Sequence, residues 1–346
     1  MPGCAIPTWC SYPFGLIEPD HAAGMPVSDS ARHAGGVLLN NLGERFMTRH
    51  APGRMELSAQ ETVTPASYTK IQEGRGSRSG AVWLGLSHLP GDTVLARLPH
   101  LHRTLLERQM LDITRDPEVV PTACISLGGI WVEAEDHSTD VDGLSAVGEA
   151  VGGPHRPEED SHSEVLTHGR IAGRAAVEYS ATLTGPRHSP AATRAAEADV
   201  LRLVAADGDH NARALQRAVR RLMTDHAGVV RDEAGLVAGL TALDEIGART
   251  ADIGVDIDIG GFSDLAHAYD LRSAVLAARA TLQCARERLG PQDCHHRSDR
   301  SGAAPALADA MVWSATTSVR RTPLWAAPTG ITEPWRDASD DAGPAL

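Results

Sequence analysis

The sequence has little lysine, few aromatic residues and no long apolar run. Its 346 residues include a single lysine, Lys70, and aromatic residues make up only 4%. A hydrophobic core must therefore be built mainly from Leu, Val, Ile and Ala. No stretch approaches the 18 consecutive apolar residues typical of a membrane-spanning helix, so none is predicted.

Charge and cysteine content narrow the class of protein further. The net charge of −13 argues against nucleic acid as a partner, because phosphate binding needs clustered Lys and Arg. No Lys or Arg precedes Arg32, so the charged start of a secretory signal is lacking. Five cysteines, an odd number, then indicate reduced thiols. We expect a cytoplasmic protein, either free or peripheral on the cytoplasmic face of a membrane.

The first half of the chain alternates short apolar runs with helical patterns. Residues 1–30 are rich in turn formers and show no sustained period. Gly74 is expected to end one helix, and Pro65 to kink its middle. Asp92 is a candidate cap for the next helix. Strands are predicted at residues 37–40, 82–86, 119–130 and 144–147, and helices at 57–73, 92–98, after Pro99, and 165–179.

Beyond a linker at residues 184–190 the pattern becomes helical. Apolar residues recur at helical spacing in three segments: Leu215, Val219, Leu222 and Met223; Leu236, Leu240 and Leu243; Leu271, Val275, Ala278 and Leu282. These segments predict a bundle that closes at Gly290-Pro291. The last 50 residues are expected to form an irregular tail packed by Trp313, Trp325 and Trp335.

Several motifs, in order and spacing, resemble the flavoprotein subunits of succinate dehydrogenase and fumarate reductase, a family related to L-aspartate oxidase. They are the run at residues 35–47, Glu73-Gly74-Arg75-Gly76, Pro121-Thr122 with Gly128-Gly129-Ile130, Val147-Gly148-Glu149, and Gly169-Arg170-Ile171-Ala172-Gly173. The resemblance covers roughly residues 9–299.

The resemblance implies an α+β or α/β fold, with a capping domain followed by the last segment of an FAD-binding sheet and a helical bundle. The expected boundaries are 1–118 for the capping (catalytic) domain, 119–182 for the FAD-sheet segment, 191–290 for the helical domain and 291–346 for the tail. An FAD-binding Rossmann segment should precede these parts. The sequence has no Gly-x-Gly-x-x-Gly run, so that segment is expected to be missing.

The resemblance also implies which residues move the proton during succinate–fumarate interconversion. Asp29 and Arg32 lie at positions that the family uses for a proton relay, and Gln60 lies where the family has its proton-donating arginine. Glutamine is neutral and does not act as a general acid, a loss that costs typically ~10²–10⁴-fold in rate. We therefore expect impaired catalysis by the chain on its own. A solvated ion pair is the alternative role for Asp29 and Arg32.

The implied substrate and cofactor contacts are altered as well. Tyr12, Ser28, Cys124, His155 and Arg156 fall at or near substrate-binding positions, and Cys124 stands where the family has a histidine. The cofactor FAD is implied by resemblance, with Gly148, Glu149 and Ser161 as its contacts. Lacking the glycine fingerprint, the chain alone is expected to be colourless.

Three functions remain open from the sequence. The chain is an impaired flavoprotein homologue, or half of a split enzyme completed by an FAD-binding chain, or a non-enzymatic module that binds dicarboxylates or proteins. An iron–sulfur subunit is the electron-transfer partner that the resemblance suggests. A metal site at Cys284, Cys294, His295 and His296 is a weak alternative, because the Cys-x9-Cys spacing fits no zinc pattern.

Overall fold

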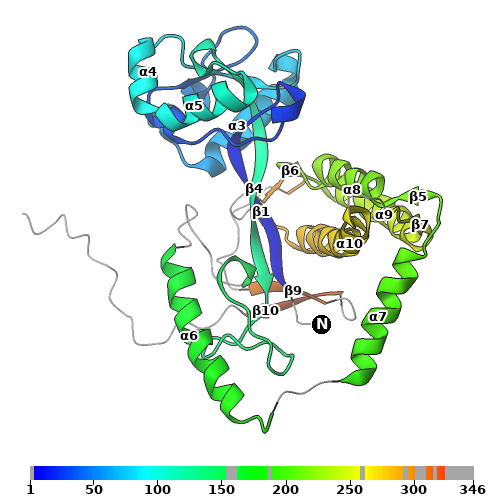
Figure 1. The fold of residues 1–346 in the computed structure, drawn as a ribbon. Helices are drawn as coiled ribbons and strands as arrows, with labels where there is room; N and C mark the ends of the chain where they lie inside the picture. The colour runs from blue at the N-terminus through cyan, green and yellow to red at the C-terminus, as the bar shows by residue number, and fades with distance from the viewer. Residues whose placement is uncertain are drawn as a thin grey trace, which may run out of the picture.

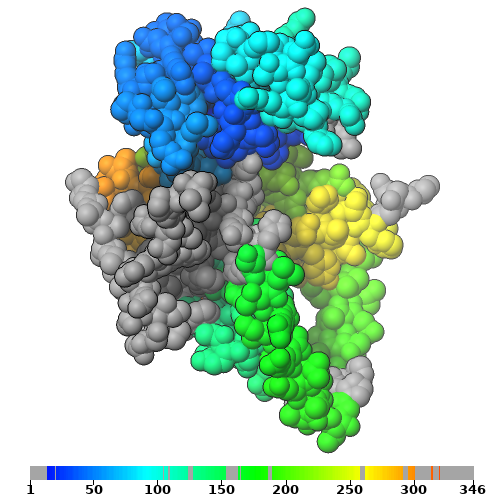
Figure 2. Space-filling view, turned by 90° about the vertical axis from the view of Figure 1, so that its left-hand side faces the viewer, coloured from blue at the N-terminus to red at the C-terminus, as the bar shows by residue number. Residues whose placement is uncertain are grey.

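A computed structural model describes residues 4–152, 162–185, 189–257, 262–290, 295–300, 309–314 and 318–323. It has mixed helix and sheet content, as predicted. An upper lobe, a helical lobe and a long two-stranded ribbon between them are seen in Figure 1. Helices α6 (His162–Ala181) and α7 (Pro190–Val204) extend beside these parts. Figure 2 shows α6 running along the outside of the molecule. None of the helices among these residues is long and apolar enough to cross a membrane.

The ribbon is formed by β1 (Cys4–Leu16) and β4 (Glu118–Ile130), which pair antiparallel along their whole length. The sheet continues on both sides in the order β10-β9-β1-β4-β3-β2. Its other strands are β2 (Val37–Leu39), β3 (Val82–Gly85), β9 (Asp309–Ser314) and β10 (Ser318–Pro323). The strands predicted at 37–40, 82–86 and 119–130 are confirmed, whereas β1 lies in a region for which no element was predicted.

In the upper lobe, short helices pack around the end of the ribbon that contains Phe14 and Leu16. Its helices are α1 (Ser30–His33), α2 (Met47–His50), α3 (Gln60–Lys70), α4 (Gly91–Arg97) and α5 (Pro99–Gln109), with short turns η1 (Asp20–Ala22), η2 (Met55–Leu57), η3 (Ile71–Arg75) and η4 (Ile113–Arg115). Phe14 and Leu16 of β1 are fully buried in its core. Gly74, at φ +71°, ends the helical run as predicted.

Two local predictions for the first half of the chain are wrong. Asp92 does not cap α4, because the N-cap residue is Pro90 and no side chain bonds there. Residues 144–147 form no strand, and the backbone at Ser145 makes only an isolated bridge to Ser138. A run of four residues without a strand partner has no ladder to join. The turn η5 (Gly148–Ala150) follows directly.

The helical lobe confirms the predicted bundle. Its helices α8 (Ala212–His226), α9 (Glu233–Arg249) and α10 (Ser263–Glu287) bury one apolar face each, on which Leu215, Leu236 and Leu271 lie. Two short parallel strand pairs lie in the segments that connect these helices. They are β5 (His210–Asn211) with β7 (Ile253–Gly254), and β6 (Val230–Arg231) with β8 (His296–Arg297). A further turn, η7 (Thr250–Asp252), follows α9.

Part of the segment after the bundle, which was expected to be an irregular tail, is regular in the described residues. Strands β9 and β10 form a hairpin, and β9 pairs with the outer end of β1. Trp313 of β9 is buried against α10, where its indole N–H donates to Gln283. Trp325 and Trp335 lie outside the described residues. The β9–β10 hairpin therefore closes one edge of the ribbon and fastens it to the helical lobe.

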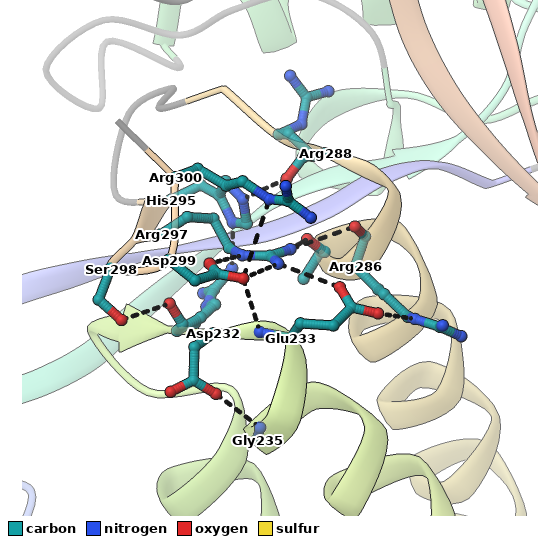
Figure 3. A network of polar contacts seen from close by, with 12 residues as sticks. Asp232, Glu233, Gly235, Arg286, Arg288, His295, Arg297, Ser298, Asp299 and Arg300 are labelled. Atoms are coloured by element: carbon teal, nitrogen blue, oxygen red, sulfur yellow. Dashed lines mark hydrogen bonds and ion pairs between the residues drawn. The ribbon is translucent and has the colours of Figure 1, made fainter. Parts of the chain in front are cut away.

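Strand β8 is fixed to the bundle by a network of arginines (Figure 3). The Arg297 side chain is 1% exposed; its Nη2 lies 2.8 Å from Asp299 Oδ2 and 3.1 Å from Glu233 Oε2. Its Nη1 donates to the carbonyl of Ala285, near the last turn of α10. A cation near the C-terminus of a helix is favourable, because the last carbonyls there lack intrahelical partners. These contacts give residues 295–299 a structural role.

His295 is held neutral by this network. Arg231 Nη1 donates to its Nδ1 at 2.8 Å, and its Nε2 lies 3.0 Å from the carbonyl oxygen of Arg288, so both ring nitrogens are engaged. Cys294 lies outside the described residues, and no cluster suited to a metal occurs within the described ranges. Burial, with the charge of Arg231, lowers the pKa of His295 from 6.5 to about 3.

The lowered pKa of His295 predicts that the free energy of unfolding falls as the pH is lowered. The unfolded chain protonates His295 near pH 6.5, while the folded chain keeps it neutral down to about pH 3. The unfolded state therefore binds more protons in this window, and stability falls as the pH drops through it. Between pH 7 and 4, His295→Gln should reduce the slope of the unfolding free energy against pH by about 1 kcal/mol per pH unit. Urea unfolding at each pH measures this slope. A matched change at exposed His33, His33→Gln, should leave the slope unchanged.

Candidate functional site

Three residues of the predicted proton relay come together where α1 meets α3. Asp29 precedes α1, Arg32 lies within it, and Gln60 is the first residue of α3. Arg32 Nη2 is 2.7 Å from Asp29 Oδ2, and Gln60 Nε2 donates to the same oxygen at 3.3 Å. One carboxylate therefore connects the arginine with the glutamine.

Arg32 is locked in place from several sides. It is 4% exposed, its Nη1 donates to the carbonyls of Glu56 and Ser58 at 2.5 and 2.9 Å, and its guanidinium lies 5.7 Å from the centre of the Phe14 ring. These contacts, together with the ion pair to Asp29, occupy most of its donors. Arg32 is buried, so the alternative of a solvated ion pair does not describe it, whereas the Asp29 side chain is 24% exposed.

Glu56 contacts this site through its backbone carbonyl, which accepts from Arg32. It was not predicted from the sequence. Its carboxylate is buried, accepts from the backbone N–H of Leu38 at 3.0 Å, and is bound by Arg45 at 2.5 Å. Burial raises the pKa of Glu56, but the hydrogen bonds from Arg45 and Leu38 outweigh burial and hold that pKa below its ordinary value. The one available signal was an acidic residue between Met55 and Leu57.

Gln60 is the neutral member of this group of three side chains. Its amide can donate a hydrogen bond, but it carries no proton to transfer near neutral pH. Asp29 thus faces a cation on one side and a neutral amide on the other. The arrangement can hold a carboxylate in a fixed geometry, whereas the amide at position 60 cannot act as a general acid.

The predicted substrate contacts are only partly described. Ser28 is exposed, and its hydroxyl accepts from the backbone N–H and the hydroxyl of Ser30 at 3.2 and 2.9 Å. The backbone of Tyr12 pairs with Thr122, and Cys124 falls in the register shift between Ala123 and Ile125, so both lie on the same stretch of the ribbon. His155 and Arg156 lie outside the described residues.

The predicted flavin contacts lie at the turn before α6. Gly148 is buried at φ +63°, a conformation that favours glycine, and Glu149 beside it is exposed. An exposed carboxylate fits the hydroxyl groups of a flavin nucleotide, because Asp and Glu accept hydrogen bonds from ribose. Ser161 lies outside the described residues. The carboxylate of Glu149 can therefore accept a hydrogen bond from FAD at one point.

Comparison with known proteins identifies two flavoprotein segments in this chain. Residues 8–162 match the family model of the FAD binding domain, and residues 216–326 match that of the fumarate reductase flavoprotein C-terminus. The chain is 32% identical over 296 residues to an uncharacterized FAD-dependent oxidoreductase of Methanocaldococcus jannaschii, covering 83% of this chain and 52% of the relative. It is 31% identical over 293 residues to a fumarate reductase (CoM/CoB) subunit of Methanothermobacter marburgensis, with the same coverage.

Further matches are also to flavoprotein subunits of this kind. The succinate dehydrogenase flavoprotein subunit of Rickettsia bellii is 31% identical over 308 residues, covering 83% of this chain and 51% of the relative. Among solved structures, Mycobacterium smegmatis Sdh1 in complex with UQ1 superposes with a TM-score of 0.79 at 28% identity, over 93% of this chain and 55% of that one. The homologues are thus flavoprotein subunits and FAD-dependent oxidoreductases, and the chain spans about half the length of the relatives it matches.

These matches correct one expectation. The FAD-binding domain was expected to be missing, but the family model of that domain matches residues 8–162, which include most of β1, the upper lobe and β4. The expectation depended on the Gly-x-Gly-x-x-Gly fingerprint alone. That fingerprint is a single turn at the pyrophosphate, so its absence does not remove the rest of an FAD-binding domain.

Proposed function

We propose that this chain is an FAD-dependent oxidoreductase of the succinate dehydrogenase and fumarate reductase type, with slow proton transfer. The observation that carries the proposal is the Asp29 carboxylate, which connects buried Arg32 with Gln60. The two flavoprotein matches on either side of the α6–α7 region support it. The substrate class is a small dicarboxylate, succinate or fumarate.

In the proposed reaction, fumarate takes up a hydride equivalent on one alkene carbon and a proton on the other. When bound, FAD supplies the two-electron chemistry. Arg32 orients Asp29, and Asp29 orients the side chain at position 60. Gln60 can donate a hydrogen bond to a substrate carboxylate, but the proton must come from water, which is slower than transfer from a positioned acid.

The remaining contacts belong to the proposal as well. His155 and Arg156 are assigned to the dicarboxylate because a dianion needs cationic or donor groups, with arginine favoured for bidentate pairing. Tyr12, Ser28 and Cys124 complete that assignment, and Gly148, Glu149 and Ser161 are assigned to FAD. The glycine fingerprint is lacking, so we propose that FAD binds weakly and must be supplied in excess. The electron partner, an iron–sulfur subunit or a soluble carrier, is proposed by resemblance.

The test is fumarate reduction by the purified chain with excess FAD and a reduced viologen dye, with succinate quantified as the product. We expect slow turnover that depends on added FAD. Arg156→Gln should raise KM for fumarate by about tenfold or more, because a charged hydrogen bond to a carboxylate is lost. Arg170→Gln, an exposed arginine of α6, is the matched control and should leave KM unchanged. FAD-independent turnover, or equal KM values in both variants, would contradict the proposal.

A further inference from the structure

A pocket lies in the upper lobe, apart from the Asp29 site. It encloses about 270 Å³ between the loop after β2, helix α2 and the end of α3. Four of its lining side chains are cationic and one is acidic: Arg45, Arg49, Lys70 and Arg75, with Glu44. Asn40, Phe46 and Thr48 complete the lining. In a chain of net charge −13, this concentration of positive charge is local.

Three of the four cations are held in place by carboxylates. Arg45 pairs with Glu56 at 2.5 Å, and Lys70 Nζ pairs with Glu73 at 2.7 Å, and neither carboxylate lines the pocket. Arg75 Nη1 lies 3.1 Å from Glu44. Side chains fixed in this way have already lost much of their conformational freedom, so a ligand that uses them meets a smaller entropic cost.

Arg49 is the cation that remains. Within the part of the chain that the structure describes, its guanidinium makes no hydrogen bond or ion pair. Its charge nonetheless reaches the pocket, because it helps to lower the pKa of Glu44, after the hydrogen bond from Asn40 and the charge of Arg75. The lining therefore carries more positive than negative charge, with one arginine fork available.

We propose that this pocket binds a small polyanion of the phosphate class, with Arg49 and Lys70 as its principal contacts. Arginine presents a planar fork that matches phosphate oxygens, and lysine supplies a compact point charge. The lining holds four cations against the single Glu44 carboxylate. Attraction to this net positive charge grows with the charge of the ligand, so a ligand with several negative charges is favoured. Inorganic pyrophosphate is the simplest representative.

The pocket is separate from the proposed dicarboxylate site. None of its lining residues belongs to the group formed by Asp29, Arg32 and Gln60. Glu56 lies between the two, since its carboxylate binds Arg45 and its carbonyl accepts from Arg32. Loss of ligand binding at one site can therefore be measured without altering a residue of the other.

The single lysine allows a direct experiment on the whole purified chain. An amine-reactive acylating reagent is applied with and without pyrophosphate, and modification of Lys70 is quantified by mass spectrometry, with the α-amino group as internal reference. We expect pyrophosphate to slow Lys70 modification severalfold while the reference is unaffected. Calorimetry with pyrophosphate on the same sample gives the affinity.

Matched variants separate a built site from general charge attraction. Arg49→Gln should weaken pyrophosphate binding by about tenfold or more, whereas Arg103→Gln, an exposed arginine of α5, removes the same charge and should leave binding unchanged. Both positions are exposed, so folding is expected to be intact, and circular dichroism checks this. Unchanged Lys70 reactivity at millimolar pyrophosphate, or equal weakening by the two variants, would overturn the proposal.

Discussion

Replacing Gln60 by arginine is expected to raise FAD-dependent fumarate reduction by about 10²-fold, the lower end of what a positioned acid contributes. Gln60 Nε2 already lies 3.3 Å from Asp29 Oδ2, so an arginine there has a carboxylate partner in place. The position is half-buried, at the first residue of α3. The assay is succinate formation with excess FAD and a reduced dye.

Gln60→Leu is the control for this variant. It removes the amide without adding an acid, so its turnover should stay at or below that of the parent chain. FAD binding by each variant is measured in parallel, so that a change in cofactor occupancy is not mistaken for a change in proton transfer. An arginine variant that binds FAD equally well and shows no gain would refute the role assigned to position 60.

Removing the Arg32 guanidinium is expected to cost about 3 kcal/mol of unfolding free energy in Arg32→Met, because Arg32 is buried and its loss leaves buried carbonyl groups without a donor. The carbonyls of Glu56 and Ser58 lose their donor, and Asp29 loses its cation. Methionine retains apolar contact with Phe14, so the loss reports mainly on the polar contacts. Urea unfolding of both proteins at one pH gives the difference.

Arg54→Met is the matched control, because Arg54 is an exposed arginine close by in the same lobe. Its effect should stay within about 0.5 kcal/mol, the range of surface substitutions. If Arg32→Met also costs less than about 1 kcal/mol, the buried network around Asp29 does not stabilise the lobe, and its role in positioning Asp29 falls with it.

Local patterns predicted the helices far better than the ribbon. The apolar faces of α8, α9 and α10 could be predicted because the helical spacing of apolar residues is visible within each segment. Strand β1 was not predicted because Pro7, Pro13 and Gly15 are typical of loops. Its partner β4 also lies more than a hundred residues away in the sequence. Long-range pairing is invisible in a local window, and the same holds for β9, which pairs with β1.

The candidate site was predictable where motif spacing decided it. Asp29, Arg32 and Gln60 were chosen by their positions relative to the family motifs, and the structure brings these three together. Glu56 and Arg45 were not predicted, because nothing local distinguishes a buried carboxylate from a solvated one. The missing-domain expectation was wrong for a related reason: one short fingerprint was taken to stand for a domain whose model matches residues 8–162.

The most direct test of a shared dicarboxylate and flavin site is the absorption spectrum of the FAD-loaded chain as succinate is added. A dicarboxylate bound beside the flavin should shift the flavin bands in a saturable manner, and Arg156→Gln should require roughly tenfold more succinate for the same shift. An unchanged flavin spectrum at millimolar succinate, in a sample that demonstrably holds FAD, would contradict the proposed function.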